Sequence, residues 1–197
     1  MTKGNNEQNI SSTLLVPENV IATSGFSNGN YLPYDASTKV TLVEFGDYEC
    51  PACSVYSPFI KQLLTDFSGK MTFVFRNYLL SYHLNAPLAS YAVEAAGLQG
   101  KYWQMHDKIY ETQNDWSGLT NPQDTFVKYA KDLGLDTNKF IEDLASDNIK
   151  NKVQKDTQDG NSVKLTETPT FYLNGKKITF TGKYEQFKKL IEEELAK

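Results

Sequence analysis

Cys50 and Cys53, the two cysteines of the chain, are separated by two residues in the motif Cys-Pro-Ala-Cys. Two sulfur atoms one helical turn apart lie within bonding reach, so such a pair can pass between a dithiol and a disulfide. The thiolate is the form that attacks a disulfide, and its abundance depends on the pKa of the cysteine. The elements around the motif therefore decide whether it is redox-active.

An apolar run, residues 40–45, precedes the motif, and its β-branched and aromatic side chains predict a buried strand. From Tyr56 onward, apolar residues recur at helical spacing, which places the cysteines at the start of a helix. Free N–H groups and the helix dipole stabilise an anion there and can lower a cysteine pKa from about 8.5 to roughly 3.5–7.5. We expect Cys50 to attack disulfides and Cys53, deeper against the sheet, to resolve the mixed disulfide.

The motif has two other interpretations. A structural zinc ion needs about four ligands, and only His83 and His106 could complete the set; their separation fits no compact histidine pair. A structural disulfide between these positions would close almost no loop and would therefore stabilise little. We expect redox chemistry, with no metal and no cofactor.

Glu44 lies in the predicted strand, on the same side as Val40 and Leu42. A buried carboxylate without a partner is costly, so such a group has a raised pKa and can exchange protons with the nearby thiols. The alternative is a glutamate at the strand end that is exposed to water.

Composition and charge exclude several classes of protein. The chain has 197 residues, 40% of them apolar, and a net charge of −4, which argues against a nucleic-acid partner. No apolar run approaches the eighteen or so residues of a membrane span. Residues 1–30 are rich in Asn, Ser, Thr and Gly and are predicted to be a flexible leader or tether.

The rest of the chain alternates between sheet and helix signals. Residues 31–34 are a candidate edge strand, and residues 71–75 predict a second buried strand, parallel to the first. A series of helical patterns follows as far as residue 160. Asn174–Gly175 then predicts a β-hairpin between two strands, and an amphipathic helix ends the chain. His106 lies on an aromatic helix face and is expected to be a packed core histidine, whereas His83 could line the site.

The order of these elements resembles the thioredoxin-fold proteins of the DsbA type. The resemblance covers about residues 30–197 and rests on three segments: residues 43–53, residues 94–107, and Thr168-Pro169-Thr170-Phe171. It implies an α/β thioredoxin fold, with a central mixed sheet flanked by helices and an inserted all-helical subdomain. The domains expected are a leader (1–30), a thioredoxin-like domain (31–82 and 161–197) and the helical insertion (83–160).

By this resemblance, Cys50 is the nucleophile, Cys53 the resolving thiol and Glu44 the buried acid below them. Pro51 and Ala52 support the site between the cysteines. Pro169 corresponds to the family's cis-proline. Thr168, before it, is expected to face the disulfide and to offer backbone groups to an extended substrate.

One departure from the family is Ala52, where the best-known oxidases have a histidine. Alanine brings no charge to the thiolate, and Asp47 and Glu49 would oppose it if they lay near in space. Oxidising strength comes from stabilising the reduced form. We therefore hypothesise that this protein oxidises less strongly than relatives that carry the histidine.

The function expected is that of a monomeric thiol:disulfide oxidoreductase that introduces disulfides into extracytoplasmic proteins. Its partners would be reduced or unfolded proteins and a membrane quinone-linked reoxidising protein, DsbB-like or vitamin K epoxide reductase-like. A signal peptide or membrane anchor would then be absent from this chain. The alternatives are a reductase or isomerase kept reduced by an electron-supplying membrane partner, a redox-inactive peptide-binding module and a metal chaperone.

Overall fold

A computed structural model of the chain describes residues 10–11, 14, 16–17, 20–179 and 182–197. Within these residues, one five-stranded sheet has the order β1-β5-β4-β6-β7, and β2 and β3 form a separate hairpin. The strands are β1 (Ala22–Thr23), β2 (Phe26–Ser27), β3 (Asn30–Tyr31), β4 (Val40–Gly46), β5 (Met71–Asn77), β6 (Thr170–Leu173) and β7 (Lys176–Ile178). The helices are α2 (Pro51–Asp66), α3 (Ala86–Leu98), α4 (Tyr102–Glu111), α5 (Gln113–Trp116), α6 (Gln123–Asp132), α7 (Thr137–Ala145), α8 (Asp147–Ser162) and α9 (Tyr184–Leu195).

The two central strands, β4 and β5, run parallel, with Val40 opposite Met71. Parallel neighbours need a crossover connection, and α2 provides it. Strand β6 runs antiparallel to β4, and a tight turn joins it to β7. The turn residues Asn174 and Gly175 have φ values of 46° and 83°, the left-handed conformation that an Asn-Gly hairpin turn requires. The predicted hairpin is confirmed.

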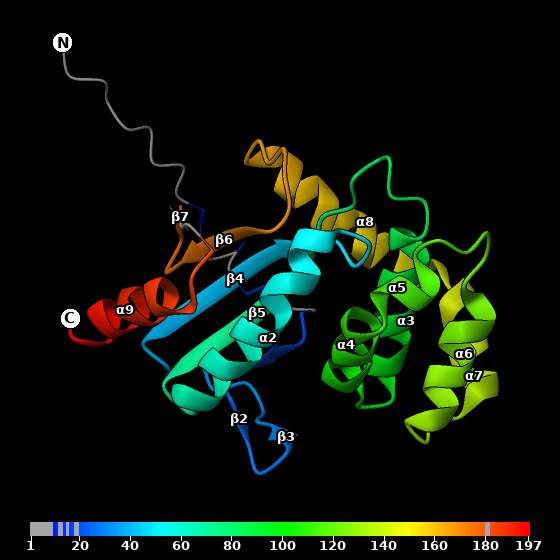
Figure 1. The fold of residues 1–197 in the computed structure, drawn as a ribbon, viewed down its shortest axis with the longest axis horizontal. Helices are drawn as coiled ribbons and strands as arrows, with labels where there is room; N and C mark the ends of the chain where they lie inside the picture. Colours follow the sequence, from blue (N-terminus) through cyan, green and yellow to red (C-terminus); the bar gives the residue numbers. More distant parts are fainter. Residues whose placement is uncertain (1–9, 12–13, 15, 18–19, 180–181) are drawn as a thin grey trace.

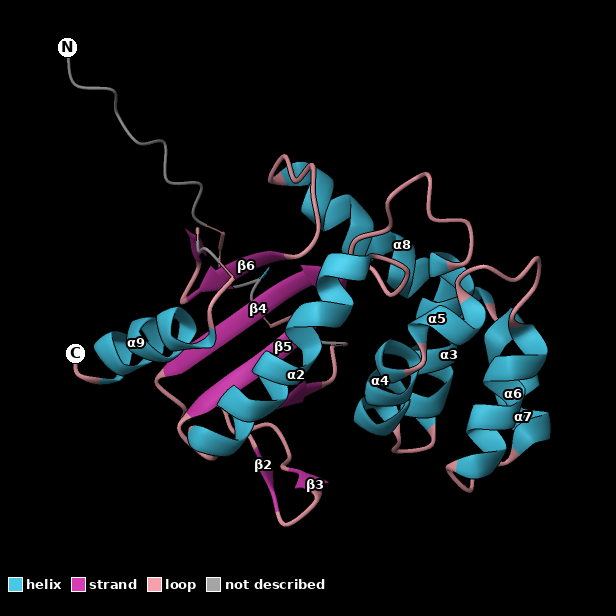
Figure 2. Ribbon diagram, in the orientation of Figure 1, coloured by secondary structure: helices cyan, strands magenta, loops and turns pink. Residues whose placement is uncertain are grey.

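Helices α2 and α9 lie across one face of the sheet (Figures 1 and 2). Consecutive residues of β4 point to opposite faces. Val40 and Leu42 pack into the core cluster that includes residues of α2 and α9. Val43 and Phe45 pack into a second cluster on the other face. This mixed sheet flanked by helices confirms the fold that the resemblance implies.

Helices α3 to α7 form a group beside the sheet (Figure 1). Helix α3 contributes a row of fully buried alanines to its contacts with α4, α7 and α8. Its buried alanines are Ala86, Ala89, Ala92, Ala95 and Ala96. Small side chains allow helices to approach closely, so this alanine-rich helix lies at the centre of the group.

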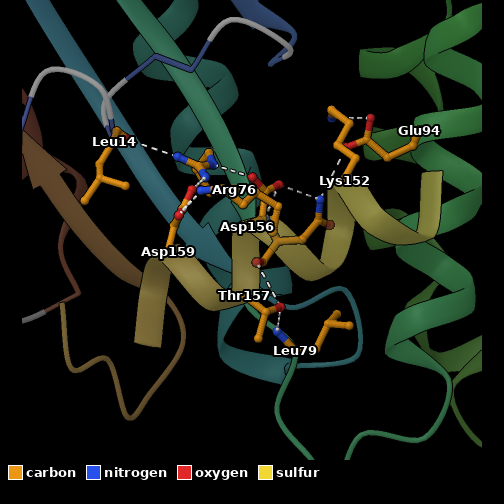
Figure 3. A network of polar contacts seen from close by, with 10 residues as sticks. Leu14, Arg76, Leu79, Glu94, Lys152, Asp156, Thr157 and Asp159 are labelled. Atoms are coloured by element: carbon orange, nitrogen blue, oxygen red, sulfur yellow. Dashed lines mark hydrogen bonds and ion pairs between the residues drawn. The ribbon is translucent and has the colours of Figure 1, made fainter. Parts of the chain in front are cut away.

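Helix α8 ties the helical group to the sheet through Arg76 of β5, whose side chain is buried (Figure 3). Its Nε and Nη2 atoms donate to Asp156 and Asp159 of α8, each at 2.6 Å. Its Nη1 atom donates to the Leu14 carbonyl at 2.8 Å. A buried guanidinium needs such partners. The predicted end of the insertion at residue 160 therefore falls inside a helix that packs on both the sheet and α3.

The end of the predicted leader is ordered, which corrects the expectation for residues 20–30. Ala22 and Thr23 are buried and pair with β5, so β1 is the edge strand at that side of the sheet. The predicted edge strand at residues 31–34 is instead represented by Tyr31 alone, which pairs with Phe26 in the separate hairpin. Two-residue strands are too short to show an alternating polar and apolar pattern, so the sequence did not place these strands correctly. Residues 1–9, 12–13, 15 and 18–19 of the predicted leader lie outside the described residues.

Candidate active site

Cys50 occupies the N-cap position of α2, with an extended backbone (φ −72°, ψ 119°), and Pro51 follows in the first turn. Proline favours this place because its fixed φ suits a helix and its missing N–H would be unpaired there anyway. The Cys50 N–H donates to the Asp47 carbonyl at 3.1 Å. The side chain of Cys53 is fully buried, while Pro51 and Ala52 are exposed. The two sulfurs therefore lie at different depths below a small exposed surface.

The two thiols are free in this structure and differ in acidity. A hydrogen bond from the Cys53 thiol, helped by the Thr168 side chain and the N–H groups of Ala52 and Cys53, lowers the pKa of Cys50 to about 6, although burial opposes the shift. Burial raises the pKa of Cys53 well above its usual value. Near pH 7, Cys50 is therefore mainly a thiolate and Cys53 a thiol.

Glu44 lies below the cysteines, in the buried part of β4, with 2% of its surface exposed. The exposed alternative for this residue is therefore wrong. Burial, followed by the negative charge of Cys50, raises the pKa of the Glu44 carboxyl to about 8. Its Oε1 atom has no hydrogen-bond partner among the described residues. Glu44 is thus mostly protonated at neutral pH and holds a proton close to both sulfurs.

Gly46 leaves the space that the buried carboxyl needs. A Cβ at this position would lie 2.4 Å from the Phe75 ring and 3.0 Å from Glu44 Oε1. The first distance is shorter than real Cβ contacts, so any larger residue would displace the ring. Sequence reasoning did not predict that Gly46 leaves room for the packing around Glu44.

The loop before β6 brings Thr168 next to Cys50. The Cys50 thiol donates to the Thr168 carbonyl at 3.4 Å, and the Thr168–Pro169 peptide bond is cis. Phe45 pairs with Thr170 in the β4–β6 ladder, which fixes the loop beside the start of α2. The structure thus brings together the predicted site residues from three separate parts of the sequence.

Asp47 and Glu49 do not act on the thiolate as the sequence suggested. The buried Asp47 carboxylate accepts the N–H groups of Glu49 (2.8 Å) and Leu80 (2.9 Å), and its Oδ2 lies 3.0 Å from His83 Nδ1. The Glu49 carboxylate accepts the first N–H groups of the α3 region, those of residues 85 and 86, at 2.7 and 2.9 Å. Both negative charges are therefore engaged away from the sulfur, and the pKa of Cys50 is lowered rather than raised.

His106 is the packed core histidine that the sequence predicted. It is buried, and burial lowers its pKa to about 4. Its Nδ1 atom forms a hydrogen bond of 2.8 Å with the Tyr48 hydroxyl, two residues before Cys50. His83 faces Asp47 and so lies beside the segment that leads to the cysteines.

The contacts that the helical group makes with the segment before Cys50 were missed. Gln113 Nε2 donates to the carbonyls of Tyr48 (2.7 Å) and Cys50 (3.0 Å), and the Tyr110 hydroxyl donates to that of Asp47 (3.3 Å). These partners lie more than sixty residues apart in sequence. No local pattern marks either of these side chains, so sequence reasoning had no signal for them.

Comparisons with known proteins agree with this architecture. Residues 35–193 match the family model described as thioredoxin. The crystal structure of oxidised BdbD from Bacillus subtilis is 29% identical, with a TM-score of 0.71 over 83% of this chain and 91% of that chain. Alpha-DsbA1 of Wolbachia pipientis is 20% identical, with a TM-score of 0.75 over 93% of this chain and 94% of that chain.

A curated relative of different size also matches. The Na(+)/H(+) antiporter NhaA 1 of Salinispora arenicola is 38% identical over 139 residues, or 70% of this chain. The chain spans about a fifth of the length of that protein, since the match covers 20% of it. In the part of the chain that the structure describes, no helix is both long enough and apolar enough to cross a membrane. No group of three or more metal-ligating side chains is found among the same residues.

Fold and site together define a thioredoxin-fold protein with a helical insertion and a cysteine pair at the start of α2. The chain belongs to the thioredoxin family, and its structure is similar to those of BdbD and the DsbA proteins.

Proposed function

We propose that this protein oxidises pairs of thiols in extracytoplasmic proteins by transferring its Cys50–Cys53 disulfide to them. The observation that carries the proposal is the asymmetry of the pair: Cys50 is acidic, with a pKa of about 6, and Cys53 below it is not. A stabilised Cys50 thiolate favours the reduced form of the enzyme and so makes its disulfide an oxidant.

The reaction begins with the oxidised enzyme. A substrate thiolate attacks Cys50 Sγ, which forms a mixed disulfide and breaks the Cys50–Cys53 bond. Cys53 leaves as a thiolate. A second substrate thiolate then attacks the substrate sulfur and releases Cys50 as a thiolate, the form that its low pKa favours. The substrate loses two electrons and two protons as its disulfide forms, and the enzyme disulfide takes up the two electrons.

Glu44 exchanges a proton with the buried sulfur of Cys53. The Cys53 thiolate is costly at its depth, and the protonated Glu44 carboxyl is the nearby acid that can neutralise it. When the dithiol is reoxidised, the Glu44 carboxylate takes the proton back as Cys53 attacks the mixed disulfide on Cys50. A pKa of about 8 suits both directions near neutral pH.

The loop around Pro169 would hold the substrate. The Thr168 carbonyl oxygen lies 3.4 Å from Cys50 Sγ, so it lies where an extended chain joined to Cys50 would pass. Reoxidation would fall to a membrane quinone-linked protein of the DsbB-like or vitamin K epoxide reductase-like kind. The protein would work as a monomer in the periplasm or cell envelope, where disulfides persist.

The test is the reduction potential of the Cys50–Cys53 pair, measured in glutathione buffers, together with the rate at which the oxidised protein forms disulfides in a reduced, unfolded protein. Cys50→Ser is the inactive control, and Cys53→Ser should trap the mixed disulfide. The Cys50 pKa of about 6 lies between those of DsbA, about 3.5, and thioredoxin, about 7. We therefore expect a potential between about −120 and −270 mV, nearer the latter. A value near or below −270 mV would favour the reductase instead.

A further inference from the structure

The helical insertion reaches the redox site through one buried amide. Gln113, in α5, is 7% exposed, and its Nε2 atom donates to the carbonyls of Tyr48 and Cys50 at 2.7 and 3.0 Å. A primary amide has two N–H donors, so both are used on these two carbonyls. The side chain therefore clamps the backbone on either side of Glu49.

The clamped backbone leads directly into the turn that contacts the sulfur. The Cys50 carbonyl also accepts the Ser54 N–H of α2 at 3.3 Å, so the amide and the helix share one acceptor. The N–H groups of Ala52 and Cys53, which help to lower the pKa of Cys50, lie in this same turn. Any rotation of the Cys50 carbonyl would change the direction of these N–H groups relative to Sγ.

A second contact holds the same segment from the neighbouring helix. The Tyr110 hydroxyl of α4 donates to the Asp47 carbonyl at 3.3 Å. The Asp47 carbonyl in turn accepts the Cys50 N–H at 3.1 Å. The helical insertion thus fixes the backbone both before and after the N–H of Cys50.

We propose that Gln113 is a positioning residue for the redox reaction, which holds the Tyr48 and Cys50 carbonyls so that the first turn of α2 faces the Cys50 sulfur. This inference rests on the proposed function, because it concerns the same cysteine. Gln113 touches neither substrate nor sulfur, and it acts through the backbone. The insertion is then part of the redox site rather than only a cover for it.

The experiment replaces Gln113 by methionine, which has a similar length and no N–H donor. The pKa of Cys50 is followed by thiolate absorbance, and the reduction potential is measured in glutathione buffers. If the lost positioning is worth as much as one net hydrogen bond, the Cys50 pKa rises by about half a unit or more. The ratio of thiolate to thiol at a given pH then falls about three-fold. The potential becomes more negative in the same variant.

Asn85→Leu is the matched control. The Asn85 amide also donates to two carbonyls, those of Ser117 and Leu119, at 3.0 and 2.8 Å. Neither carbonyl belongs to residues 47–50, the segment that Gln113 and Tyr110 contact. This variant loses the same number of amide hydrogen bonds and should lose stability while keeping the Cys50 pKa of the wild type. A purely structural role for Gln113 predicts the same result for both variants.

Gln113→Glu is a second test variant, for the case in which the methionine variant does not fold. A buried glutamate that faces two carbonyl oxygens is protonated and has one O–H donor in place of two N–H donors, so it raises the Cys50 pKa by less than methionine does. A folded Gln113→Met or Gln113→Glu protein with the wild-type pKa and potential overturns the inference. A wild-type protein whose Cys50 fails to exchange with disulfides would instead overturn the proposed function, so the two failures can be told apart.

Discussion

Replacing Glu44 by glutamine should make the stability of the protein less sensitive to pH. The native pKa of Glu44 is about 8, against the ordinary value of 4.5 that it regains on unfolding. Between these values the native state holds a proton that the unfolded chain releases, so stability falls as pH rises from 4.5 to 8. At pH 7 the difference spans 2.5 units, which corresponds to about 3 kcal/mol. Glutamine, which has the same shape and no charge, removes this loss.

The assay is denaturant unfolding of the reduced protein between pH 4 and pH 8. We expect Glu44→Gln to gain about 3 kcal/mol relative to wild type between pH 4 and pH 7, with most of the gain above pH 5. The exposed Glu142 on α7 supplies the control, since Glu142→Gln should follow the wild type at every pH. A constant difference between Glu44→Gln and wild type would refute the argument from burial.

The same variant separates stability from catalysis. Glutamine cannot give a proton to Cys53 or take one from it, so exchange should slow even as the protein becomes more stable. Turnover with a reduced, unfolded protein checks this, and the rate of alkylation of Cys50 serves as the comparison. Equal slowing of both reactions would point to a disturbed Cys50, whereas selective slowing of turnover is expected of a lost proton donor.

Three further outcomes follow from the site. Alkylation of Cys50 should reach half its maximal rate near pH 6, while Cys53 stays unreactive to pH 8; equal rates for both sulfurs would contradict the asymmetry. Ala52→His should lower the Cys50 pKa further and raise the potential, and an unchanged pKa would count against charge stabilisation at this position. Gly46→Ala should cost about 1–3 kcal/mol of stability because its Cβ meets the Phe75 ring at 2.4 Å; thermal unfolding measures this, and a Tm equal to wild type would disprove the close fit.

The parts of the fold that the sequence predicted are those with local signals. The strand before the cysteines has a continuous apolar run, the helix after them has a 3.6-residue period, and the Asn174–Gly175 turn has the two residues that its backbone needs. The burial of Glu44 followed from its position in the strand, because alternate residues share a face. Each of these inferences needs only neighbouring residues.

The parts that were missed depend on contacts across the chain. Asp47 and Glu49 looked like charges that would oppose the thiolate, because sequence shows their distance along the chain and not the direction of their side chains. In the structure, Glu49 turns to the start of α3, some 36 residues away. Asp47 turns to the loop that follows β5. Apart from His83 beside Asp47, their partners are backbone N–H groups, which every sequence has, so residue types alone could not reveal them.

This difference bears on how the redox site is built. The thiolate position itself is local, since Cys50, Pro51 and the start of α2 are encoded together. Its surroundings are not local: Thr168 comes from the loop before β6, and Gln113 comes from the helical insertion. A cysteine motif therefore fixes which atom reacts and, through Cys53, supplies the main stabilisation of its thiolate, whereas the distant segments adjust how acidic that atom is. Substitutions at Gln113 should consequently change the reduction potential while leaving the motif and the fold intact. The Cys-Pro-Ala-Cys sequence by itself could not predict this change.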